Sequence, residues 1–363
     1  MVDLFCGCGG LSIGFSAAGF RVALGIDIHV PSIRTFQLNH PSASTILGDI
    51  RRVPDDLIIR AIGDGQVAVV VAGVPCEGFS LQNRKRHEGD ERNFLFWEFI
   101  RVIRLLRPSY VLLENVPGLR TSANGAFLRR IAMAIQESGY RVEHRVLNAL
   151  DYGVPQSRPR VFFLGALPGL PITWPVPTHG PNSPDRRPYR TVGDAISDLP
   201  PLGPGEAKAE YAAEPANEYQ ALMRRLAHRL LNHEAPRHAP STVDRIARTP
   251  PGSPLFSSYP QRIRLSLHDP SPTLVSGGIR PQYFFGHPTQ PRGLTTRECC
   301  RIQSIPDHYE IVGGLVQERV QVGNAVPPLL AEAIAREIHA GLRGQRTAHR
   351  MPAETPAQLG LGI

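Results

Sequence analysis

Short apolar runs alternate with stretches of helical spacing over the first 165 residues of the chain. Runs rich in branched apolar residues predict strands at Val2–Phe5, Arg21–Ile26, Val67–Ala72, Tyr110–Leu113 and Val161–Gly165. Between them, apolar positions three and four residues apart predict helices at Gly10–Ala18, Pro31–Asn39, Phe94–Leu106 and Phe127–Ser138. Strands that alternate with helices predict an α/β fold, in which helices cover both faces of a mostly parallel sheet.

The pattern changes near Leu167, where the chain becomes rich in proline. Prolines interrupt the sequence up to about Ser258, although Tyr219–Leu231 has helical spacing. Aromatic residues and leucines recur here, so we expect a second, irregular domain. Helical spacing returns from Leu294 and ends in Pro327–Leu342, which has the apolar positions needed to return and cover the first strand. We therefore divide the chain into residues 1–166, 167–260, 261–343 and a polar tail, 344–363, that we expect to be disordered.

Charge and cysteine content narrow the classes of function. Forty basic residues against 32 acidic ones give a net charge of +8, which favours an anionic partner such as nucleic acid. No apolar run approaches the length of a membrane span, and no basic, cleavable leader is present, so we expect a cytoplasmic protein. The five cysteines fit neither a disulfide framework nor the paired spacing of a zinc site. We expect no metal ion.

A glycine-rich turn, in Asp3–Leu11, lies between the first predicted strand and the first predicted helix. Its glycines let a ligand approach the backbone, as in dinucleotide and adenosylmethionine sites. Asp27 follows the second strand, where a carboxylate can accept hydrogen bonds from ribose hydroxyls. Asp49 follows a third strand and can accept from an adenine amino group. Each carboxylate alone is more often solvated, but together they outline an adenosine pocket.

Cys76 directly follows a proline, at the end of the apolar run Val67–Ala72. Open α/β folds place their chemistry at this edge of the sheet. Pro75 fixes its own φ and biases Val74 towards an extended backbone, so the thiol is held in a defined direction. A lone cysteine is more often a small buried core residue. The other motifs favour a nucleophile.

Charged residues also stand at the ends of two later strands. Glu114 directly follows Tyr110–Leu113, where burial can raise its pKa enough for it to donate a proton. The alternative is a helix-capping or salt-bridged acid. Arg158 and Arg160, on alternate residues at a strand start, point to one side and can hold a carbonyl or phosphate oxygen. Elsewhere such arginines would be solvated surface charges.

These motifs, in this order, resemble the DNA (cytosine-5) methyltransferase family, of bacterial restriction-modification type. The resemblance covers residues 1–165 and 262–342 and leaves the middle as the part that varies between members. It implies a Rossmann-like class I methyltransferase domain and a smaller, irregular target-recognition domain at 167–260. The matching segments are the Asp3–Gly10 turn, Pro75-Cys76, Glu114-Asn115-Val116, Gln156-x-Arg158-x-Arg160, Arg297–Gln303 with Pro306-Asp307, and Gly323–Pro328.

The resemblance implies methylation of carbon 5 of cytosine in a specific double-stranded DNA sequence, with S-adenosyl-L-methionine as methyl donor. Cys76 matches the nucleophile that adds to ring carbon 6, and Glu114 the acid that relieves charge at ring nitrogen 3. Arg158 and Arg160 match the pair that holds the base carbonyl and nearby backbone. The expected cofactor contacts are Phe5, Cys6, Gly7, Gly9, Gly10, Leu11, Asp27, Ile28, Asp49, Ile50, Pro75, Asn324 and Val326.

Because stacked DNA hides carbon 6, the resemblance also implies that the target nucleotide is flipped out of the helix. The loop Leu81–Arg92, which contains Arg84, Lys85 and Arg86, is expected to be a mobile lid beside Cys76. We expect a monomer that acts on double-stranded DNA in the bacterial cytoplasm, at the nucleoid. The resemblance also allows a second partner, a cognate restriction endonuclease that acts on the same DNA sequence.

Two residues depart from the family pattern, and other functions compete. Glu77 stands where members most often have glutamine, and Asp27 replaces the more usual glutamate, but neither change removes a required group. A tRNA cytosine-5 methyltransferase is the first alternative, although that group has little inserted sequence in place of 167–260. A catalytically silent relative would lack catalytic residues that are present here. A nicotinamide-dependent oxidoreductase would rest on the glycine turn alone, whose spacing does not fit GxGxxG.

Overall fold

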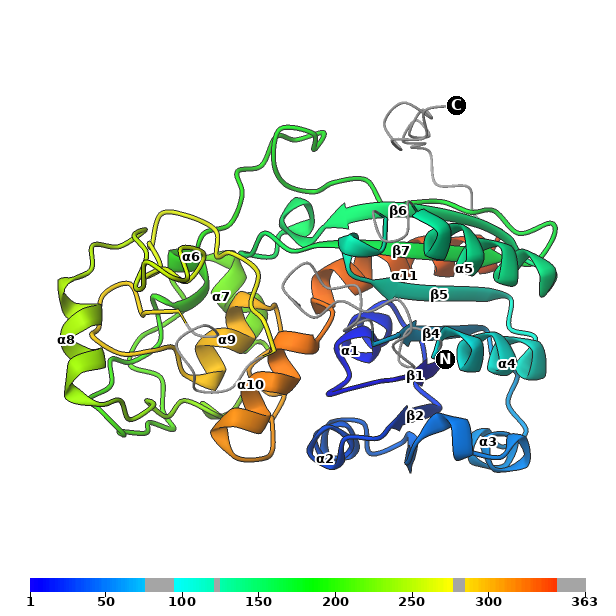
Figure 1. Ribbon diagram of the computed structural model, residues 1–363, viewed down its shortest axis with the longest axis horizontal. Helices are drawn as coiled ribbons and strands as arrows, with labels where there is room; N and C mark the ends of the chain where they lie inside the picture. Colours follow the sequence, from blue (N-terminus) through cyan, green and yellow to red (C-terminus); the bar gives the residue numbers. More distant parts are fainter. Residues whose placement is uncertain (76–94, 121–124, 277–284, 345–363) are drawn as a thin grey trace.

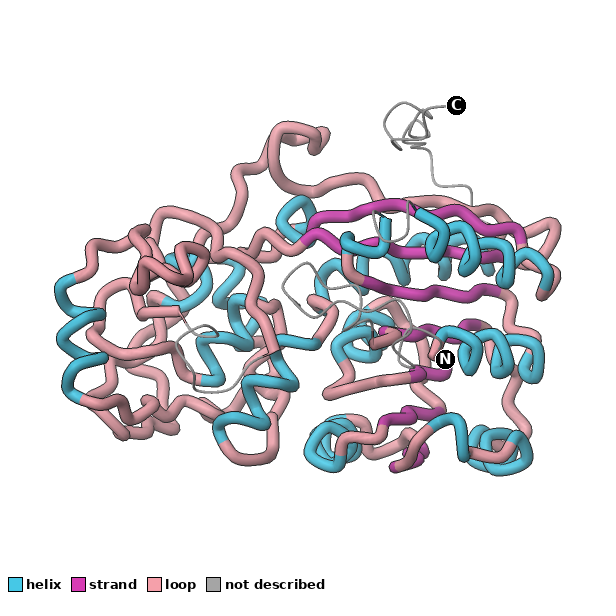
Figure 2. Tube along the Cα trace, viewed as in Figure 1, coloured by secondary structure: helices cyan, strands magenta, loops and turns pink. Residues whose placement is uncertain are grey.

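The computed structural model describes residues 1–75, 95–120, 125–276 and 285–344. They form two parts that lie side by side: a sheet between helices, and a smaller part of short helices and loops (Figure 1). The tube view separates the strands of the first part from the loop-rich second part (Figure 2). The α/β fold predicted from the alternation of strands and helices is confirmed.

A seven-stranded sheet in the order β3-β2-β1-β4-β5-β7-β6 forms the first part. Neighbours from β3 to β5 are parallel, whereas β7 runs antiparallel to both β5 and β6. Because β7 is reversed, it begins at the edge where the other strands end. The strands are β1 Val2–Leu4, β2 Leu24–Asp27, β3 Ser44–Leu47, β4 Val69–Gly73, β5 Tyr110–Asn115, β6 Arg141–Asn148 and β7 Pro159–Ala166.

The observed elements differ from the predicted ones in a few places. β1 ends at Leu4 because Phe5 takes up a left-handed backbone with φ of 57°. β5 continues through Asn115, so Glu114 lies inside the strand instead of after it. The pattern does not predict β6, because this edge strand is largely exposed or half-buried and carries charged residues instead of an apolar run.

Helices cover both faces of the sheet, and successive strand residues alternate between two cores. Val71 faces the core that contains α1 and α11, whereas Val70 faces the core that contains α3, α4 and α5. Both faces are therefore apolar, which explains the uninterrupted apolar runs of the central strands. The helices are α1 Gly10–Ala17, α2 Val30–Asn39, α3 Asp55–Ile62, α4 Phe96–Leu106, α5 Ala126–Glu137 and α11 Pro328–Leu342, with single turns at η1 Ile50–Arg52, η3 Pro117–Arg120 and η5 Ala149–Tyr152.

Helix α11 returns from the C-terminal region to pack along α1. An added Cβ at Gly14 would lie 2.5 Å from the Ala331 Cβ and from the Pro328 carbonyl oxygen. Only glycine permits this approach of the two helices. Met1, Phe15 and Ile334 share the core beneath them. The C-terminal helix therefore covers the sheet as its apolar spacing predicts.

The second part has its own core. Val192, Tyr219, Leu265, Leu274 and Ile302 belong to one apolar cluster, which combines segments from both sides of residue 260. The predicted helix from Tyr219 is shorter than expected, because α7 ends at Arg224. The predicted domain boundaries stay predictions. The helices here are α6 Val192–Ile196, α7 Glu218–Arg224, α8 Pro240–Arg248, α9 Thr296–Ile302 and α10 Leu315–Asn324.

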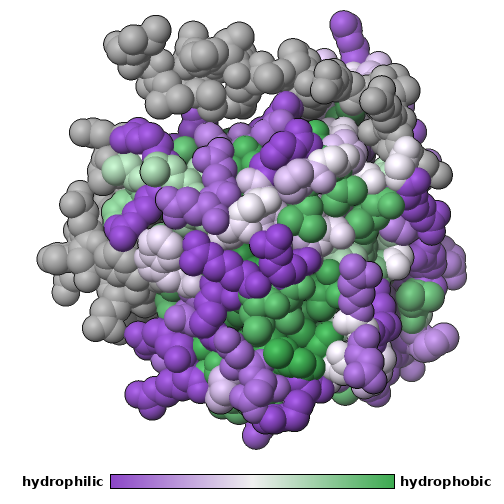
Figure 3. Space-filling model, turned by 90° about the vertical axis from the view of Figure 1, so that its right-hand side faces the viewer, coloured by the Kyte–Doolittle hydropathy of each residue, from purple (hydrophilic) through white to green (hydrophobic). Residues whose placement is uncertain are grey.

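The carboxyl ends of the parallel strands point towards the second part (Figure 1). Figure 3 shows the opposite end of the molecule, where hydrophobic residues are exposed between hydrophilic ones. In the described segments, no helix has the length and apolar character required to cross a membrane. Since the predicted site residues Asp27 and Glu114 lie at the carboxyl ends of their strands, they stand at the edge of the sheet that faces the second part.

Candidate active site

The glycine-rich turn after β1 is held in an unusual backbone conformation. Phe5, Gly7 and Gly9 have φ angles of 57°, 54° and 90°. The Gly9 N–H donates to the Cys6 carbonyl at 2.8 Å, and Gly9 precedes the first residue of α1. A Cβ added at Gly7 would meet nothing within 4 Å, so this position faces open space. The turn leaves room for a ligand beside the N-terminus of α1.

Asp27, the last residue of β2, holds this turn from the neighbouring strand. Its Oδ2 accepts from the Gly7 N–H at 2.8 Å, and its Oδ1 accepts from the His29 N–H at 2.8 Å. Each carboxylate oxygen can accept more than one hydrogen bond, so Asp27 keeps capacity for a ligand hydroxyl. The next side chain, Ile28, is 66% exposed and offers an apolar surface beside the carboxylate.

Asp49 lies two residues after β3, so acids do stand near the ends of successive strands. Both oxygens of Asp49 accept hydrogen bonds from Arg51, including one from Nη2 to Oδ2 at 2.7 Å. The hydrogen bonds from the Arg51 side chain lower the pKa of Asp49. In this structure the Asp49 carboxylate is therefore engaged by Arg51.

The remaining predicted cofactor contacts fall into two groups. Phe5, Pro75 and Asn324 are partly or fully exposed. Ile50 is buried in the sheet core, and its carbonyl accepts from Arg101 Nη2 at 3.0 Å. The side chains of Cys6, Leu11 and Val326 are also buried in the core. Gly9 and Gly10 are buried as well, with atoms of other residues close above their Cα atoms.

Glu114 and Arg160 meet where β5 ends and β7 begins. Glu114 pairs with Phe162 in the antiparallel register, so Arg160, two residues earlier, lies on the same face of the sheet. The Arg160 Nε lies 3.0 Å from the Glu114 Oε1, and both side chains are only 12% exposed. Burial raises the pKa of Glu114, although Arg160 and Arg158 oppose the shift. Glu114 is thus both buried and paired with an arginine, and its role as a proton donor stays a prediction.

The segment that precedes Cys76 lies at the same edge of the sheet as Glu114. Asn115 Nδ2 donates to the Val74 carbonyl at 3.4 Å, one residue before Pro75, where the described segment ends. A Cβ added at Gly73 would lie 3.7 Å from the Glu114 Oε2. The predicted nucleophile Cys76, the neighbouring Glu77 and the loop 81–92 lie outside the described residues. Glu114 thus stands beside the start of the segment that carries Cys76.

Arg158 makes different contacts from Arg160. It is 2% exposed, and its Nη1 and Nη2 donate to the carbonyls of Leu274 at 2.7 Å and Gly323 at 2.8 Å. Both carbonyls belong to the second part: Leu274 lies in its apolar core and Gly323 in α10. Two of its donors are therefore committed to backbone oxygens, and Arg158 joins the start of β7 to distant segments.

Glutamine side chains extend this junction. Gln156 Nε2 donates to Gln303 Oε1, while Gln156 Oε1 accepts from the Leu274 N–H at 2.9 Å. Gln303 in turn donates to the carbonyl of Ala325, directly after the predicted cofactor contact Asn324. Both glutamines stand in the matching motifs, but the sequence alone does not show that they pair. The pairing links the motif before β7 to the segment that precedes α11.

Asp3, which is not among the expected cofactor contacts, lies in β1, directly before the glycine-rich turn. Its Oδ2 accepts from the Ser12 hydroxyl at 2.6 Å, while its Oδ1 is buried and has no partner among the described residues. Burial raises the pKa of Asp3 to about 7. The signal in the sequence is a single acid inside the apolar run that forms β1. An unpaired buried carboxyl oxygen beside the glycine turn suits a ligand that donates hydrogen bonds.

Cys6, Cys8, Cys299 and Cys300 are free thiols, and burial raises the pKa of each above its ordinary value. A raised pKa lowers the thiolate fraction, so these cysteines are poor nucleophiles. No group of three or more His, Cys, Asp or Glu residues that could hold a metal ion occurs in the part of the chain that is described.

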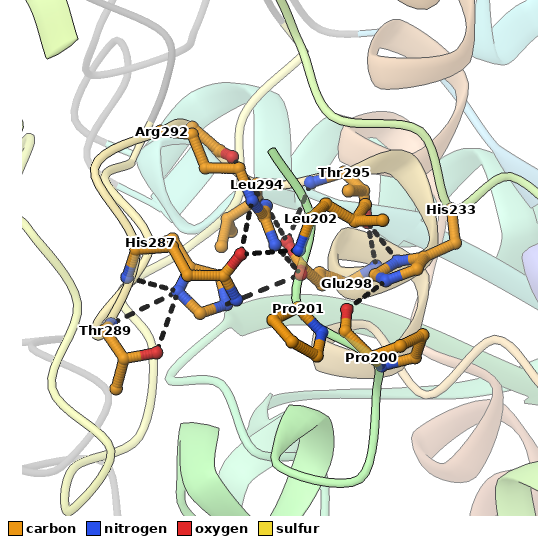
Figure 4. Close-up of polar contacts among 12 residues, drawn as sticks. Pro200, Pro201, Leu202, His233, His287, Thr289, Arg292, Leu294, Thr295 and Glu298 are labelled. Atoms are coloured by element: carbon orange, nitrogen blue, oxygen red, sulfur yellow. Dashed lines mark hydrogen bonds and ion pairs between the residues drawn. The ribbon is translucent and has the colours of Figure 1, made fainter. Parts of the chain in front are cut away.

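A buried polar network holds the interior of the second part (Figure 4). Arg292 donates to both oxygens of Glu298, at 2.9 and 2.7 Å, and the His287 Nε2 lies 3.4 Å from the Glu298 Oε1. Burial opposes ionisation of Glu298, but the hydrogen bonds from Arg292 and His287 outweigh it and lower its pKa. Thr295 caps α9 through the same glutamate, so this network fixes the start of α9.

Comparisons with known proteins cover almost the whole chain. A family model described as C-5 cytosine-specific DNA methylase matches residues 1–340. Type II methyltransferase M1.HphI of Haemophilus parahaemolyticus is 35% identical over 349 residues, which cover 93% of this chain and 86% of that protein. Type II methyltransferase M.DdeI of Desulfomicrobium norvegicum is 36% identical over 369 residues, covering 93% and 88%.

Solved structures are similar over the same length. A putative DNA modification methyltransferase encoded within a prophage (E. coli) is 25% identical with a TM-score of 0.78, covering 94% of this chain and 99% of that one. The Dnmt2 methyltransferase of S. pombe is 15% identical with a TM-score of 0.58, covering 94% and 98%, a likeness of fold alone.

Proposed function

Because this chain belongs to the C-5 cytosine-specific DNA methylase family, we propose that it methylates carbon 5 of a cytosine within a specific double-stranded DNA sequence. The predicted enzyme class, a DNA cytosine-5 methyltransferase, is confirmed, and so is the resemblance that the six motifs indicate. The methyl donor and the role of each residue are proposals that rest on the contacts of the described residues.

The residues around the glycine turn fit S-adenosyl-L-methionine, which supplies an electrophilic methyl group when bound. Gly7 faces open space, and Asp3 has a buried oxygen without a partner among the described residues. That oxygen suits the ammonium group of the cofactor. Asp27 keeps capacity for the ribose hydroxyls, and the exposed Ile28 suits the adenine ring. Asp49 would have to share its carboxylate between Arg51 and the adenine amino group.

One observation carries the proposed mechanism: the buried pair of Glu114 and Arg160 beside the segment that leads to Cys76. We propose that the Cys76 thiolate adds to carbon 6 of the flipped cytosine while Glu114 gives a proton to ring nitrogen 3. This addition moves the C5–C6 double bond to C4–C5 and gives an enamine, whose carbon 5 would take the methyl group of S-adenosyl-L-methionine with release of S-adenosyl-L-homocysteine. A base such as a water molecule then takes the proton on carbon 5, which reforms the C5–C6 double bond and expels the thiolate, while ring nitrogen 3 returns its proton to Glu114.

The two arginines take separate roles in this proposal. Arg160 is largely buried, holds Glu114 and can donate to the base carbonyl with its remaining N–H groups. Arg158 acts as a positioning residue, because two of its donors bind the Leu274 and Gly323 carbonyls. This assignment divides the expected role of the pair, with Arg160 for the base carbonyl and Arg158 for nearby backbone.

The second part, whose core is formed by α6, α7 and α9, is proposed to read the DNA sequence. It faces the carboxyl edge of the sheet, so bound DNA would lie against both parts (Figure 1). We propose a bacterial enzyme of restriction-modification type, because its relatives in Haemophilus parahaemolyticus and Desulfomicrobium norvegicum are type II methyltransferases. A monomeric state, a place at the nucleoid in the cytoplasm and a cognate endonuclease are parts of this proposal.

The decisive experiment traps the covalent intermediate. A first step expresses the chain in a host without cytosine methylation and maps modified cytosines by bisulfite sequencing. A duplex with 5-fluorocytosine at the mapped position is then incubated with enzyme and S-adenosyl-L-methionine. We expect a denaturant-resistant conjugate at Cys76, and no conjugate with Cys76→Ser, because fluorine cannot leave carbon 5 as a cation.

The outcomes separate the competing functions. A wild-type conjugate at another cysteine, or methylation by Cys76→Ser near the wild-type rate, would refute Cys76 as nucleophile. Methyl transfer to tRNA in place of duplex DNA would favour the tRNA enzyme. Tight DNA binding without methyl incorporation would favour a silent relative.

A further inference from the structure

Residues 309–312, which we name the strap, connect α9 to α10 and lie between the two parts of the molecule. The hydrogen bonds of this segment alternate between the parts. Arg297 Nη2 of α9 donates to the Tyr309 carbonyl at 2.7 Å. At the next residue, Glu310, both backbone groups bind Asn39 at the end of α2, with distances of 3.0 and 2.8 Å.

The alternation continues along the strap. Both backbone groups of Ile311 bind the side chain of Asn232 in the second part, at 2.9 and 2.7 Å. The N–H of Val312 then donates to Thr35 Oγ1 of α2 at 3.0 Å. The strap is thus held residue by residue from both parts, so a shift of one part relative to the other moves it.

The first residue of the strap reaches the glycine turn. The Tyr309 side chain is 2% exposed, and its hydroxyl donates to the Cys8 carbonyl at 2.5 Å. The Gly9 N–H, in the same peptide unit, donates to the Cys6 carbonyl at 2.8 Å. Both the carbonyl and the N–H group of the Cys8–Gly9 peptide are therefore hydrogen-bonded, which fixes the orientation of this peptide in a turn where Gly7 and Gly9 are left-handed.

Burial raises the pKa of Tyr309 well above its ordinary value, so the hydroxyl remains a donor at neutral pH. The contact is close, because a Cβ added at Gly9 would lie 2.6 Å from the Tyr309 hydroxyl oxygen. A phenylalanine would keep the ring packing and remove only the hydrogen bond to the turn.

We propose that Tyr309 is a positioning residue for the cofactor turn, and that the strap couples DNA binding at the second part to cofactor binding at the sheet. This inference rests on the proposed function. When DNA binds the second part, Asn232 and Arg297 change the position of the strap to which they are hydrogen-bonded. Tyr309 passes this change in position to the Cys8–Gly9 peptide through its hydroxyl. By linkage, bound cofactor then raises the affinity for DNA by the same factor.

The first test measures S-adenosyl-L-methionine affinity of Tyr309→Phe by isothermal titration calorimetry. We expect the Kd without DNA to rise about 3- to 10-fold, the range that one net hydrogen bond supports. Tyr140→Phe is the matched control, since the buried Tyr140 hydroxyl also donates to a backbone carbonyl, that of Pro108 at 2.9 Å. The control is expected to leave the cofactor Kd unchanged even if both variants lose similar stability in urea.

The second test measures coupling with Asn232→Gly. Asn232 has a φ of 56°, so glycine removes its side chain without backbone strain. The readout is the ratio of cofactor Kd without and with the mapped duplex. We expect the wild-type ratio to be about 3 or more and the ratio of Asn232→Gly to fall close to 1, with its Kd in the absence of DNA little changed.

The results distinguish a failure of the proposed function from a failure of the proposed role of Tyr309 and the strap. A wild-type protein that does not bind S-adenosyl-L-methionine at all would refute the proposed function. Normal binding by the wild type with an equal Kd for Tyr309→Phe would refute the positioning role. A wild-type ratio of 1, or an unchanged ratio in Asn232→Gly, would refute the coupling.

Discussion

Asp3 offers a prediction whose size follows from the structure. Asp3 lies in the middle of β1 and is 1% exposed, with one carboxyl oxygen bound by Ser12 and the other without a partner in the described segments. Burial raises its pKa from 3.8 in a model compound to about 7 in the folded protein. The folded state therefore holds the Asp3 proton more tightly than the unfolded state. This contribution to stability is complete below pH 4 and is lost as the pH rises through 7.

The two pKa values set the magnitude. Integrating the linkage relation between pH 5 and pH 8 gives a loss of about 2 to 3 kcal/mol in the free energy of unfolding from Asp3 alone. Asp3→Asn does not titrate, so this part of the pH dependence disappears. The N-terminal amine, whose pKa burial lowers to about 6, contributes an opposite slope in both proteins. The difference between wild type and variant is therefore the useful quantity.

Urea unfolding of both proteins without cofactor, at several pH values from 5 to 8, measures this difference. We expect the stability of Asp3→Asn relative to wild type to increase by about 2 to 3 kcal/mol across the range. Ser12→Ala is the opposite perturbation, because the Ser12 hydrogen bond lowers the pKa of Asp3. Its removal should extend the loss of stability to higher pH, so the total loss between pH 5 and pH 8 becomes larger than in the wild type. Parallel pH profiles for wild type and Asp3→Asn would refute the reasoning. Weaker cofactor binding by Asp3→Asn would accompany the gain in stability under the proposed function.

Three further predictions test other parts of the site. Glu114→Gln should lower kcat by about 10²- to 10⁴-fold, since the amide cannot give a proton to the base, while DNA affinity in gel-shift assays stays near wild type. Gly10→Ala places a Cβ 2.4 Å from the Val326 carbonyl oxygen, so we expect a loss of about 1 to 3 kcal/mol in urea and weaker cofactor binding. Gly48→Ala, whose Cβ meets nothing closer than 3.9 Å, is its control, and equal behaviour of the two would contradict the steric argument. Arg158→Met leaves two buried carbonyls without donors and should cost about 3 kcal/mol or more in unfolding experiments; a stable variant that has lost only base binding would return Arg158 to a direct role.

Much of the site was accessible from local pattern. The central strands carry apolar residues on both faces, and the chemistry follows each strand where it ends, so Asp27 and Glu114 could be placed at one edge before any contact was known. Edge strand β6 lacks such a run, because half of its surface faces solvent, and it could not be predicted in the same way.

The sequence by itself determined the α/β architecture, the glycine turn and the order of the motifs, because hydrophobic periodicity and turn residues act over a few neighbours. Only the tertiary structure decided which distant groups meet. The reversal of β7 brings Arg160 to Glu114, and chain closure brings Leu274 and Gly323 to Arg158. These partners lie far from one another in sequence, and their pairing depends on the packing of the two parts.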